Sequence, residues 1–303
     1  MTDQSTLINI TEKKPTKVSI GMPVYNGEKY IRDALNSLLE QTFSNFELII
    51  SDNCSTDGTA KICQEYALRD NRIIYHRQKT NIGAAANFEF VLNSARAPIF
   101  MWAAHDDKWT KGFLYNAMEI LNEESIDFAF PSFKLKSIRL KITKRFNREV
   151  FEFVSSHNKR ERVLEFLALH HDSHKCNIVY SVVRTELLRS AHKLQNISND
   201  GALGCVLLSL GRGGLVMGEY FIKRYNYFWP GIFSWFYAYY HKNNSTKFNN
   251  AKESALTDLS KLFPEYIKEI TEIFNKYQPF TFGRSYQICE VYYALGKVEQ
   301  NDK

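Results

Sequence analysis

The sequence has no long apolar run and little of what marks fibrous or disulfide-rich chains. No stretch of about 18 apolar residues occurs, and the polar N-terminus lacks the apolar core of a secretion signal. With 14 glycines and 7 prolines among 303 residues, a collagen-like chain is excluded, and a hydrophobic content of 44% excludes a wholly disordered one. The sequence therefore predicts a globular protein with a sizeable core.

Cysteine is also scarce, and its pattern indicates neither a disulfide framework nor a metal site. No C-x-x-C pair occurs, and the number is odd: Cys54, Cys63, Cys176, Cys205 and Cys289. Reduced thiols in apolar or helical stretches are typical of the cytosol. We therefore expect a cytoplasmic protein.

The net charge is mildly positive and is spread along the chain. Lys and Arg number 39 against 33 Asp and Glu, which gives a formal net charge of +6. This excess suits an anionic ligand or an anionic membrane surface. No zinc-finger spacing, RNA-binding aromatic motif or basic helical repeat accompanies the charge, so nucleic acid is not an expected partner.

The first half of the chain alternates short β-branched runs with helical patterns. Strands are predicted at residues 18–22, 46–51, 72–76 and 99–103, with helical spacing of apolar residues between them. This alternation predicts an α/β fold with a mostly parallel sheet flanked by helices. Right-handed crossovers bring the carboxyl ends of parallel strands to one edge, where ligands bind. The segments expected at this edge are all polar: PVYNGEKY, DNCSTDGT, NIGAAAN and HDDKW.

The second half shows a weaker pattern. A strand is predicted at residues 128–133, followed by a Lys- and Arg-rich run, 134–148, that we interpret as a β-hairpin or a mobile loop. Helical spacing returns at 162–170 and 201–210, with a strand near 178–183 between them. The sequence thus predicts further strands and helices beyond the regular first half.

Acidic residues stand where predicted strands end. Asp52 is placed to accept a hydrogen bond from a ligand N–H, such as the imide of uracil or thymine, whereas Asp57 is interpreted as a helix cap. Asp106 and Asp107 follow an apolar strand, and adjacent carboxylates repel unless a cation or hydrogen bonds compensate. A divalent metal is one compensator. An exposed turn, or Asp107 capping the helix near Thr110, is the alternative.

Taken together, the motifs PVYNGEKYI, DNCSTDGT, NIGAAAN and HDDKW resemble those of nucleotide-sugar-dependent glycosyltransferases of family-two type, which have the GT-A fold. The resemblance covers about the first 110 residues and rests on the order and spacing of the motifs. It implies a nucleotide-diphosphate sugar as donor and Mg²⁺ or Mn²⁺ as cofactor. It also assigns nucleotide-binding residues: Pro23, Tyr25 (stacked on the base), Asn26, Asp52 on the pyrimidine edge, Asn81, Gly83 and Asp106.

The metal motif departs from the family pattern. Asp106 matches the last Asp of the family's D-x-D signature, but Ala104 stands where the first Asp is usual, with His105 between them. The resemblance therefore implies a metal held by Asp106 and Asp107 together with the donor phosphates. His105 is interpreted as a structural or solvated residue.

The resemblance also implies a general base that takes the proton of the acceptor hydroxyl. The matching segment is NISNDGALGCVLLSLGRGG, in which Asn199 replaces the first member of the family's usual acidic pair and Asp200 precedes an apolar helix. Asp200 is therefore the predicted base. Its alternative role is that of an N-cap or first-turn acid of this helix.

The aromatic stretch Tyr220–Tyr240 has two interpretations. It fits core and domain contacts, and, with Lys223, Arg224, His241 and Lys242 beside it, it also fits a surface that rests on a membrane interface. The second interpretation predicts peripheral contact at the inner face of the cytoplasmic membrane. We divide the chain into a disordered tail (1–16), a GT-A domain (17–218, with a nucleotide-binding half 17–110 and an acceptor half 111–218) and an aromatic and helical C-terminal extension (219–303).

The resemblance predicts an inverting glycosyltransferase that transfers a sugar from a UDP- or dTDP-sugar to a saccharide acceptor, including a lipid-linked one, in bacterial surface polysaccharide synthesis. The alternative is a non-catalytic nucleotide-sugar-binding or scaffold protein of the same fold. A dehydrogenase would need G-x-G-x-x-G after the first strand, where the chain has GMPVYNG.

Overall fold

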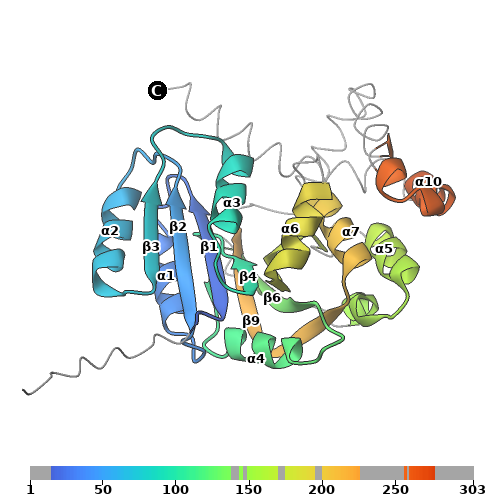
Figure 1. Ribbon diagram of the computed structural model, residues 1–303, viewed down its shortest axis with the longest axis horizontal. Coiled ribbons are helices and arrows are strands. Elements are labelled where there is room, and N and C mark those ends of the chain that lie inside the picture. The colour runs from blue at the N-terminus through green and yellow to red at the C-terminus, as the bar shows by residue number, and fades with distance from the viewer. Residues whose placement is uncertain are drawn as a thin grey trace, which may run out of the picture.

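The structure is a computed structural model in which a mixed nine-stranded sheet is flanked by helices (Figure 1). It describes residues 15–137, 143–145, 149–169, 175–194, 200–225, 256–257 and 259–276. Most of the predicted N-terminal tail and the greater part of the aromatic stretch lie outside these residues. The predicted α/β fold is confirmed.

The first half forms the parallel part of the sheet, in the order β3-β2-β1-β4. Its strands are β1 (Val18–Val24), β2 (Phe46–Asp52), β3 (Ile73–Arg77) and β4 (Ile99–Trp102). The helices between them are α1 (Ile31–Leu39), α2 (Thr59–Arg69) and α3 (Ala84–Asn93). The predicted alternation of strands and helices is therefore confirmed.

Burial explains why these segments fold as they do. Every residue of β1 and β2 is buried, as expected for central parallel strands covered on both faces. In α1 the buried side chains recur at helical spacing and form one apolar stripe, made by Ile31, Ala34, Leu35 and Leu38. The central strands thus hold the loops at their carboxyl ends on a fully packed base.

The second half extends the sheet beyond β4 in the order β8-β6-β9-β5, with β7 paired to β6. The strands are β5 (Lys108–Trp109), β6 (Phe128–Ser137), β7 (Thr143–Arg145), β8 (Val182–Arg184) and β9 (Gly213–Tyr225). The helices are α4 (Phe113–Leu121), α5 (Lys159–Ala168), α6 (Thr185–Leu194) and α7 (Asp200–Leu210), with 3₁₀ helices η1 (Glu149–Ser155) and η3 (Lys175–Tyr180).

The second half contains the predicted hairpin and helix, but the strand between them is displaced. The antiparallel pairing of β6 with β7 confirms a hairpin in the Lys- and Arg-rich run, and α7 confirms the helix predicted at 201–210. The strand predicted at 178–183 was wrong over most of its length, because the chain forms η3 up to Tyr180 and β8 starts only at Val182. A short apolar run does not distinguish a strand from a buried helical turn by its periodicity.

Strand β9 crosses the predicted domain boundary between residues 218 and 219. It pairs in parallel with β6 as far as Tyr225 and antiparallel with β5. Gly213 begins this strand where the ring of Phe128 leaves no room for a Cβ atom. The sheet therefore continues past residue 218 to Tyr225.

The C-terminal part that the structure describes is helical and packs against α5. It includes the 3₁₀ helix η4 (Pro264–Tyr266) and α10 (Ile267–Lys276), which lies beside α5 in Figure 1. Leu259, Phe263 and Ile270 are buried in the main core. Within the described parts of the chain, no helix has the length and apolar character needed to cross a bilayer.

Candidate functional site

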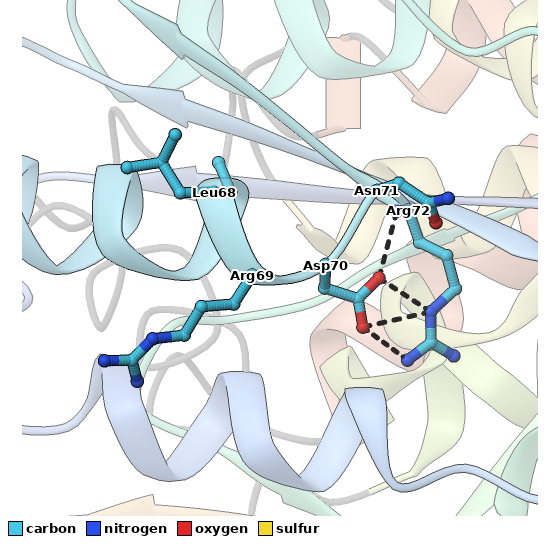
Figure 2. A pocket seen from close by; sticks show the side chains of 6 residues that line it. Leu68, Arg69, Asp70, Asn71 and Arg72 are labelled. Carbon is cyan, nitrogen blue, oxygen red and sulfur yellow. Dashed lines mark hydrogen bonds and ion pairs between the residues drawn. The ribbon is translucent and has the colours of Figure 1, made fainter.

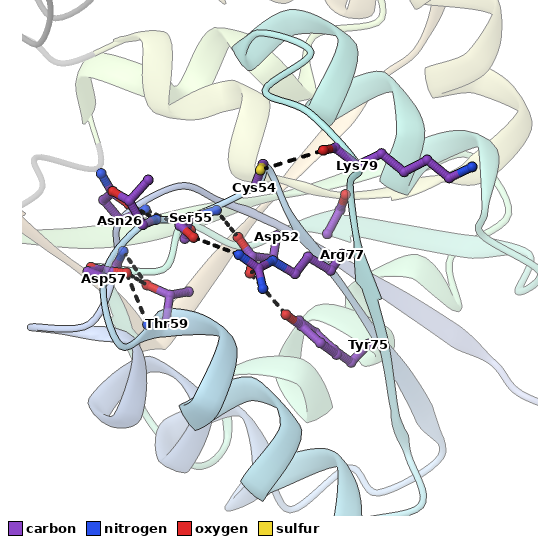
Figure 3. Close-up of polar contacts among 12 residues, drawn as sticks. Asn26, Asp52, Cys54, Ser55, Asp57, Thr59, Tyr75, Arg77 and Lys79 are labelled. Atoms are coloured by element: carbon purple, nitrogen blue, oxygen red, sulfur yellow. Dashed lines mark hydrogen bonds and ion pairs between the residues drawn. The ribbon is translucent and has the colours of Figure 1, made fainter.

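The polar loops that follow β1 and β2 are joined by hydrogen bonds at one edge of the sheet (Figure 3). Asn26, in the left-handed conformation with φ 50°, accepts a bond on Oδ1 from the Thr56 N–H at 2.9 Å. Its own N–H donates to Ser55 Oγ at 2.9 Å. The Gly27 N–H likewise donates to Thr59 Oγ1 at 2.8 Å. The turn after β1 is therefore held in place by the start of α2.

Asp57 strengthens the same junction. Its Oδ1 accepts the backbone N–H of Thr59 at 3.0 Å, and its Oδ2 accepts the N–H of Glu28 at 3.1 Å. Partial burial opposes ionisation of this carboxyl. The hydrogen bond from the Thr59 hydroxyl, together with these backbone bonds, outweighs it and holds the pKa of Asp57 below its usual range. Gly58 is the N-cap residue of α2, so Asp57, the predicted cap, lies one residue before it and accepts hydrogen bonds from two loops.

Asn53 joins the loop after β2 to the loop after β3. Its Nδ2 donates to Asn81 Oδ1 at 2.9 Å and to the Gly83 carbonyl oxygen at 3.2 Å, while its Oδ1 accepts the Ile82 N–H at 2.9 Å. Gly83, with φ 85°, is the N-cap residue of α3. Sequence reasoning missed Asn53, although its side-chain amide both donates and accepts hydrogen bonds and can therefore join two loops.

Asp52 is fully buried, and neighbouring residues of the protein donate hydrogen bonds to its carboxylate. Its Oδ1 accepts the Ser55 N–H at 2.8 Å, and its Oδ2 accepts the Tyr75 hydroxyl at 2.9 Å, with Arg77 Nε at 3.7 Å. Burial and the adjacent Asp52 carboxylate raise the pKa of the Tyr75 hydroxyl. Because Asp52 is fully buried, a ligand N–H reaches it only if the side chains around it move. Tyr75 and Arg77 are the supporting residues that sequence reasoning did not identify.

The predicted base-binding residues of the first loop lie at the end of β1. Pro23 is buried within the strand, opposite Ser51 of β2, and Tyr25 is half-buried directly after it. Because Tyr25 directly follows the last residue of β1, it lies at the carboxyl edge of the sheet, where Asn26 and Asn53 hold the loops. Stacking of Tyr25 on a base stays a prediction.

His105 packs the loop after β4 onto the loop after β1. A Cβ atom at Gly27 would lie 2.6 Å from Cδ2 of His105, so only glycine allows this contact. Burial lowers the pKa of the His105 imidazole, which favours its neutral form. His105 is therefore a packing residue, in agreement with the structural role predicted for it.

The two adjacent aspartates have different environments. Asp106 is partly exposed in the turn after β4, whereas Asp107 is 1% exposed. Asp107 Oδ1 accepts the Arg224 N–H at 3.0 Å, and its Oδ2 lies 3.7 Å from Lys223 Nζ. Burial raises the pKa of Asp107 to about 7. Contacts with β9 therefore offset only part of the cost of burying the Asp107 charge.

The fit of a divalent metal to this site depends on Asp106. In the part of the chain that the structure describes, no three His, Cys, Asp or Glu side chains gather into a metal-binding group. Mg²⁺ and Mn²⁺ prefer oxygen ligands, and Mg²⁺ is commonly held by one or two carboxylates together with substrate phosphates. The partly exposed carboxylate of Asp106 suits such a site, in which the protein supplies few ligands.

Asp200, the predicted base, is the first residue of α7. This helix packs against α5, α6 and η3. The expected place at a helix N-terminus is confirmed, and a role as base stays a prediction.

A separate hollow lies at the turn between α2 and β3 (Figure 2). It has a volume of about 490 Å³ and is lined by residues 67–72. Asp70 and Arg72 are fixed there by hydrogen bonds of 2.7 to 3.3 Å between carboxylate and guanidinium. Because β3 begins at this turn, the hollow lies at the amino ends of the parallel strands and contains no predicted site residue.

Comparison with known proteins identifies the family of this sequence. The model of the family described as "Glycosyl transferase family 2" matches residues 19–186. The chain is 38% identical over 126 residues to the protein named "Putative teichuronic acid biosynthesis glycosyltransferase TuaG" of Bacillus subtilis. The aligned residues make up 42% of this chain and 50% of TuaG. It is 30% identical over 117 residues to the glycosyltransferase GlyA of Streptococcus pneumoniae, 39% of this chain and 17% of GlyA. The matches thus span half or less of these relatives.

Solved structures share the fold at low sequence identity. TarS 1-349 of S. aureus, in complex with UDP-GlcNAc, matches with a TM-score of 0.53 and 23% identity over 70% of this chain and 60% of that chain. The mannosyltransferase PcManGT of Pyrobaculum calidifontis, in complex with GDP-Man and Mn²⁺, matches with a TM-score of 0.53 and 14% identity over 84% of this chain and 68% of that chain.

Proposed function

This chain belongs to glycosyl transferase family 2, and from that premise we propose that it is an inverting glycosyltransferase that uses a UDP- or dTDP-sugar. The observation that carries the proposal is the hydrogen-bonded set of loops at the carboxyl ends of β1, β2 and β3, with Asp106 in the turn after β4. Ligands of open α/β sheets bind at this edge.

The nucleoside part of the donor is proposed to bind across the first three loops. Tyr25 stacks on the base, and Pro23 and Asn26 shape the first loop beside it. Asn81 and Gly83 line the base and the ribose, in a loop held by Asn53. Asp52 contacts the pyrimidine edge only when the residues that bury it move, and otherwise supports the loop.

The diphosphate is proposed to lie against Asp106. A Mg²⁺ or Mn²⁺ ion held by Asp106 and the phosphate oxygens would stabilise the negative charge that develops on the leaving nucleoside diphosphate. The sequence predicts Asp107 as a second ligand, but its contacts with β9 leave Asp106 as the better placed carboxylate. Ala104 supplies no ligand to this site.

Asp200 is proposed to act as the general base. It accepts the proton of the acceptor hydroxyl while that oxygen attacks the anomeric carbon. A new C–O bond forms, the bond from the anomeric carbon to the phosphate oxygen breaks, and its electron pair leaves with the nucleoside diphosphate. Because attack and departure occur on opposite sides, the anomeric configuration is inverted.

The acceptor is proposed to be a saccharide of a bacterial surface polysaccharide, free or lipid-linked, since TuaG is named for teichuronic acid biosynthesis. A lipid-linked acceptor would bring the protein to the cytoplasmic membrane. Because β9 runs to Tyr225 and Phe221 in it is fully buried, the contact segment is proposed to be residues 226–240 of the aromatic stretch. Sedimentation with phosphatidylglycerol vesicles tests this contact, and an unchanged amount of protein in the supernatant would speak against it.

The proposed activity is tested by incubating the protein with a panel of nucleotide sugars and Mn²⁺ and detecting released nucleotide and glycoside product. A thermal shift with UDP, dTDP and GDP, each with and without Mn²⁺, identifies the nucleotide first, because a ligand that binds only the folded state raises its stability. If the protein neither hydrolyses any donor nor transfers a sugar from it, the assignment as an enzyme is refuted.

A non-catalytic nucleotide-sugar-binding protein is the second candidate, because Ala104 replaces the first acid of the family's metal motif. The substitution Asp200→Asn separates the two. An enzyme loses turnover and keeps its affinity for the nucleotide, whereas a binding protein has no transfer to lose.

A further inference from the structure

Asp107 and Lys223 lie opposite each other at the end of the β5–β9 pairing. The strands are antiparallel with Lys108 opposite Ile222, and the next pair in this register is Asp107 with Lys223. Lys223 Nζ lies 3.7 Å from Asp107 Oδ2, and the N–H of Arg224 donates to Asp107 Oδ1 at 3.0 Å. Strand β9 thus contacts both carboxylate oxygens of Asp107.

The environment of this pair makes charge compensation important. Asp107 is 1% exposed, and its Oδ2 has no hydrogen-bond partner among the described residues. The Lys223 ammonium lies 4.5 Å from the centre of the Tyr180 ring and 5.6 Å from that of Phe221. Asp107 is the buried member of the pair, since the Lys223 side chain is 31% exposed. Removing Lys223 leaves the buried charge of Asp107 uncompensated, which is more harmful than replacing both members by neutral groups.

The same residue closes the turn that carries Asp106. The Asp107 N–H donates to the Ala104 carbonyl oxygen at 3.3 Å, so His105 and Asp106 form the middle of this turn. One side of the turn is packed through His105 on Gly27, and the other is held by Asp107 on β9. Fixing both sides leaves Asp106 little freedom.

We propose that Asp107 and Lys223 form a positioning pair, which fixes the turn that presents Asp106 to the donor diphosphate and its metal, and that Asp107 is not itself a ligand. The inference rests on the proposed function and deepens it. When Lys223 is neutralised, Asp107 loses the cation opposite its Oδ2 and holds the turn less firmly on β9. When both residues are neutral, the hydrogen bonds of the turn and β9 suffice to hold Asp106.

The test measures UDP affinity by titration calorimetry with and without Mn²⁺ in the full chain. The variants are Asp106→Asn, Asp107→Asn, Lys223→Met and the double variant Asp107→Asn with Lys223→Met, and circular dichroism checks their folding. Asp106→Asn removes the gain in affinity that Mn²⁺ gives. Lys223→Met reduces that gain about 10-fold, the effect expected for loss of a residue that orients a metal ligand. The double variant restores it.

Two further variants control the comparison. Lys223→Arg keeps the charge and retains the Mn²⁺ gain, which also serves if Lys223→Met does not fold. Lys111→Met removes an exposed lysine that pairs with Glu40 and leaves UDP affinity unchanged.

The outcomes separate this inference from the proposed function. If the unchanged protein binds UDP with a Mn²⁺ gain, but the double variant loses that gain as Asp106→Asn does, Asp107 is a ligand and only the positioning inference is overturned. If the unchanged protein binds no nucleoside diphosphate, the proposed function and the inference both fail.

Discussion

The Tyr75 hydroxyl donates a 2.9 Å hydrogen bond to the buried Asp52 carboxylate and so joins β3 to the last residue of β2. Figure 3 shows Asp52 beside Ser55, whose N–H donates to the same carboxylate at 2.8 Å. The bond from Tyr75 links an edge strand of the sheet to the candidate nucleotide site.

The substitution Tyr75→Phe tests the importance of this bond. It removes one donor from a buried carboxylate, and an unsatisfied buried group costs about 1–3 kcal/mol of unfolding free energy. Urea unfolding measures the loss. Tyr66→Phe is the matched control, because the Tyr66 hydroxyl donates to Asn36 at an exposed position, where about 0.5 kcal/mol or less is expected. Equal losses in the two variants would contradict a special role for Tyr75.

Cys54 and Cys63 are expected to differ in reactivity. Burial, reinforced by the nearby Asp52 and Asp57 carboxylates, raises the pKa of Cys63 to about 12, so this thiol stays protonated at pH 8. Cys54 is half-exposed in the loop after β2, beside the proposed nucleotide site. Its Sγ lies 3.7 Å from the Lys79 carbonyl oxygen. Iodoacetamide at pH 8 followed by peptide mass spectrometry should show alkylation of Cys54 but not of Cys63.

Bound UDP should slow the alkylation of Cys54. The same labelling with adenosine as ligand serves as control, because it lacks both the pyrimidine base and the diphosphate. Alkylation of Cys54 at one rate with and without UDP would place the nucleotide away from the loop after β2.

The Asp70–Arg72 contact predicts an acid-dependent stability. The hydrogen bonds from Arg72 lower the pKa of Asp70 from its usual value of 3.8. A group with a lowered pKa in the folded state stabilises the fold above its unfolded pKa and loses this contribution as the pH falls through the folded value. Melting temperatures at pH 7 and pH 3 should therefore differ less in Asp70→Asn than in the unchanged protein. The exposed Glu89, changed to Gln, is the control and should leave the difference unaltered.

The packing of α10 on α5 predicts that a C-terminal core residue matters more than an ion pair there. Ile270 is completely buried, and Ile270→Ala should reduce the unfolding free energy by about 2–5 kcal/mol. Glu269→Gln breaks the exposed contact with Arg160 and should change it little. Denaturant unfolding measures both. A larger effect of Glu269→Gln would mean that charge, rather than burial, holds α10.

The first half of the fold was predictable because each element carries its own periodic signal. The strands β1, β2 and β4 are apolar runs, and the apolar stripe of α1 recurs at helical spacing. The second half depends on pairings between distant segments, such as β6 with β9, which local patterns do not contain. Strand β8 has three residues and no periodic signal of its own, so the predicted strand at 178–183 overlaps it only at its end.

The candidate site was predictable as a set of loops but not as a set of contacts. Motif order placed Asn26, Asn81 and Asp106 at one edge, where the structure also has the loops. The sequence did not show that Asp52 is enclosed by Tyr75, that Asn53 joins two loops, or that Asp107 turns toward β9. These relations depend on which of two neighbouring side chains faces the interior, and a one-residue difference reverses that direction.

Strand β9 sets a limit for constructing chimeric proteins from this chain. It starts three residues after the end of α7 and runs between β6 and β5 to Tyr225. A fusion point before Tyr225 would cut β9, which pairs with β6. The backbone groups of β6 would then be left unpaired, which favours aggregation. Exchange of acceptor-side segments between relatives should therefore keep residues 200–225 as one unit and place the junction after them.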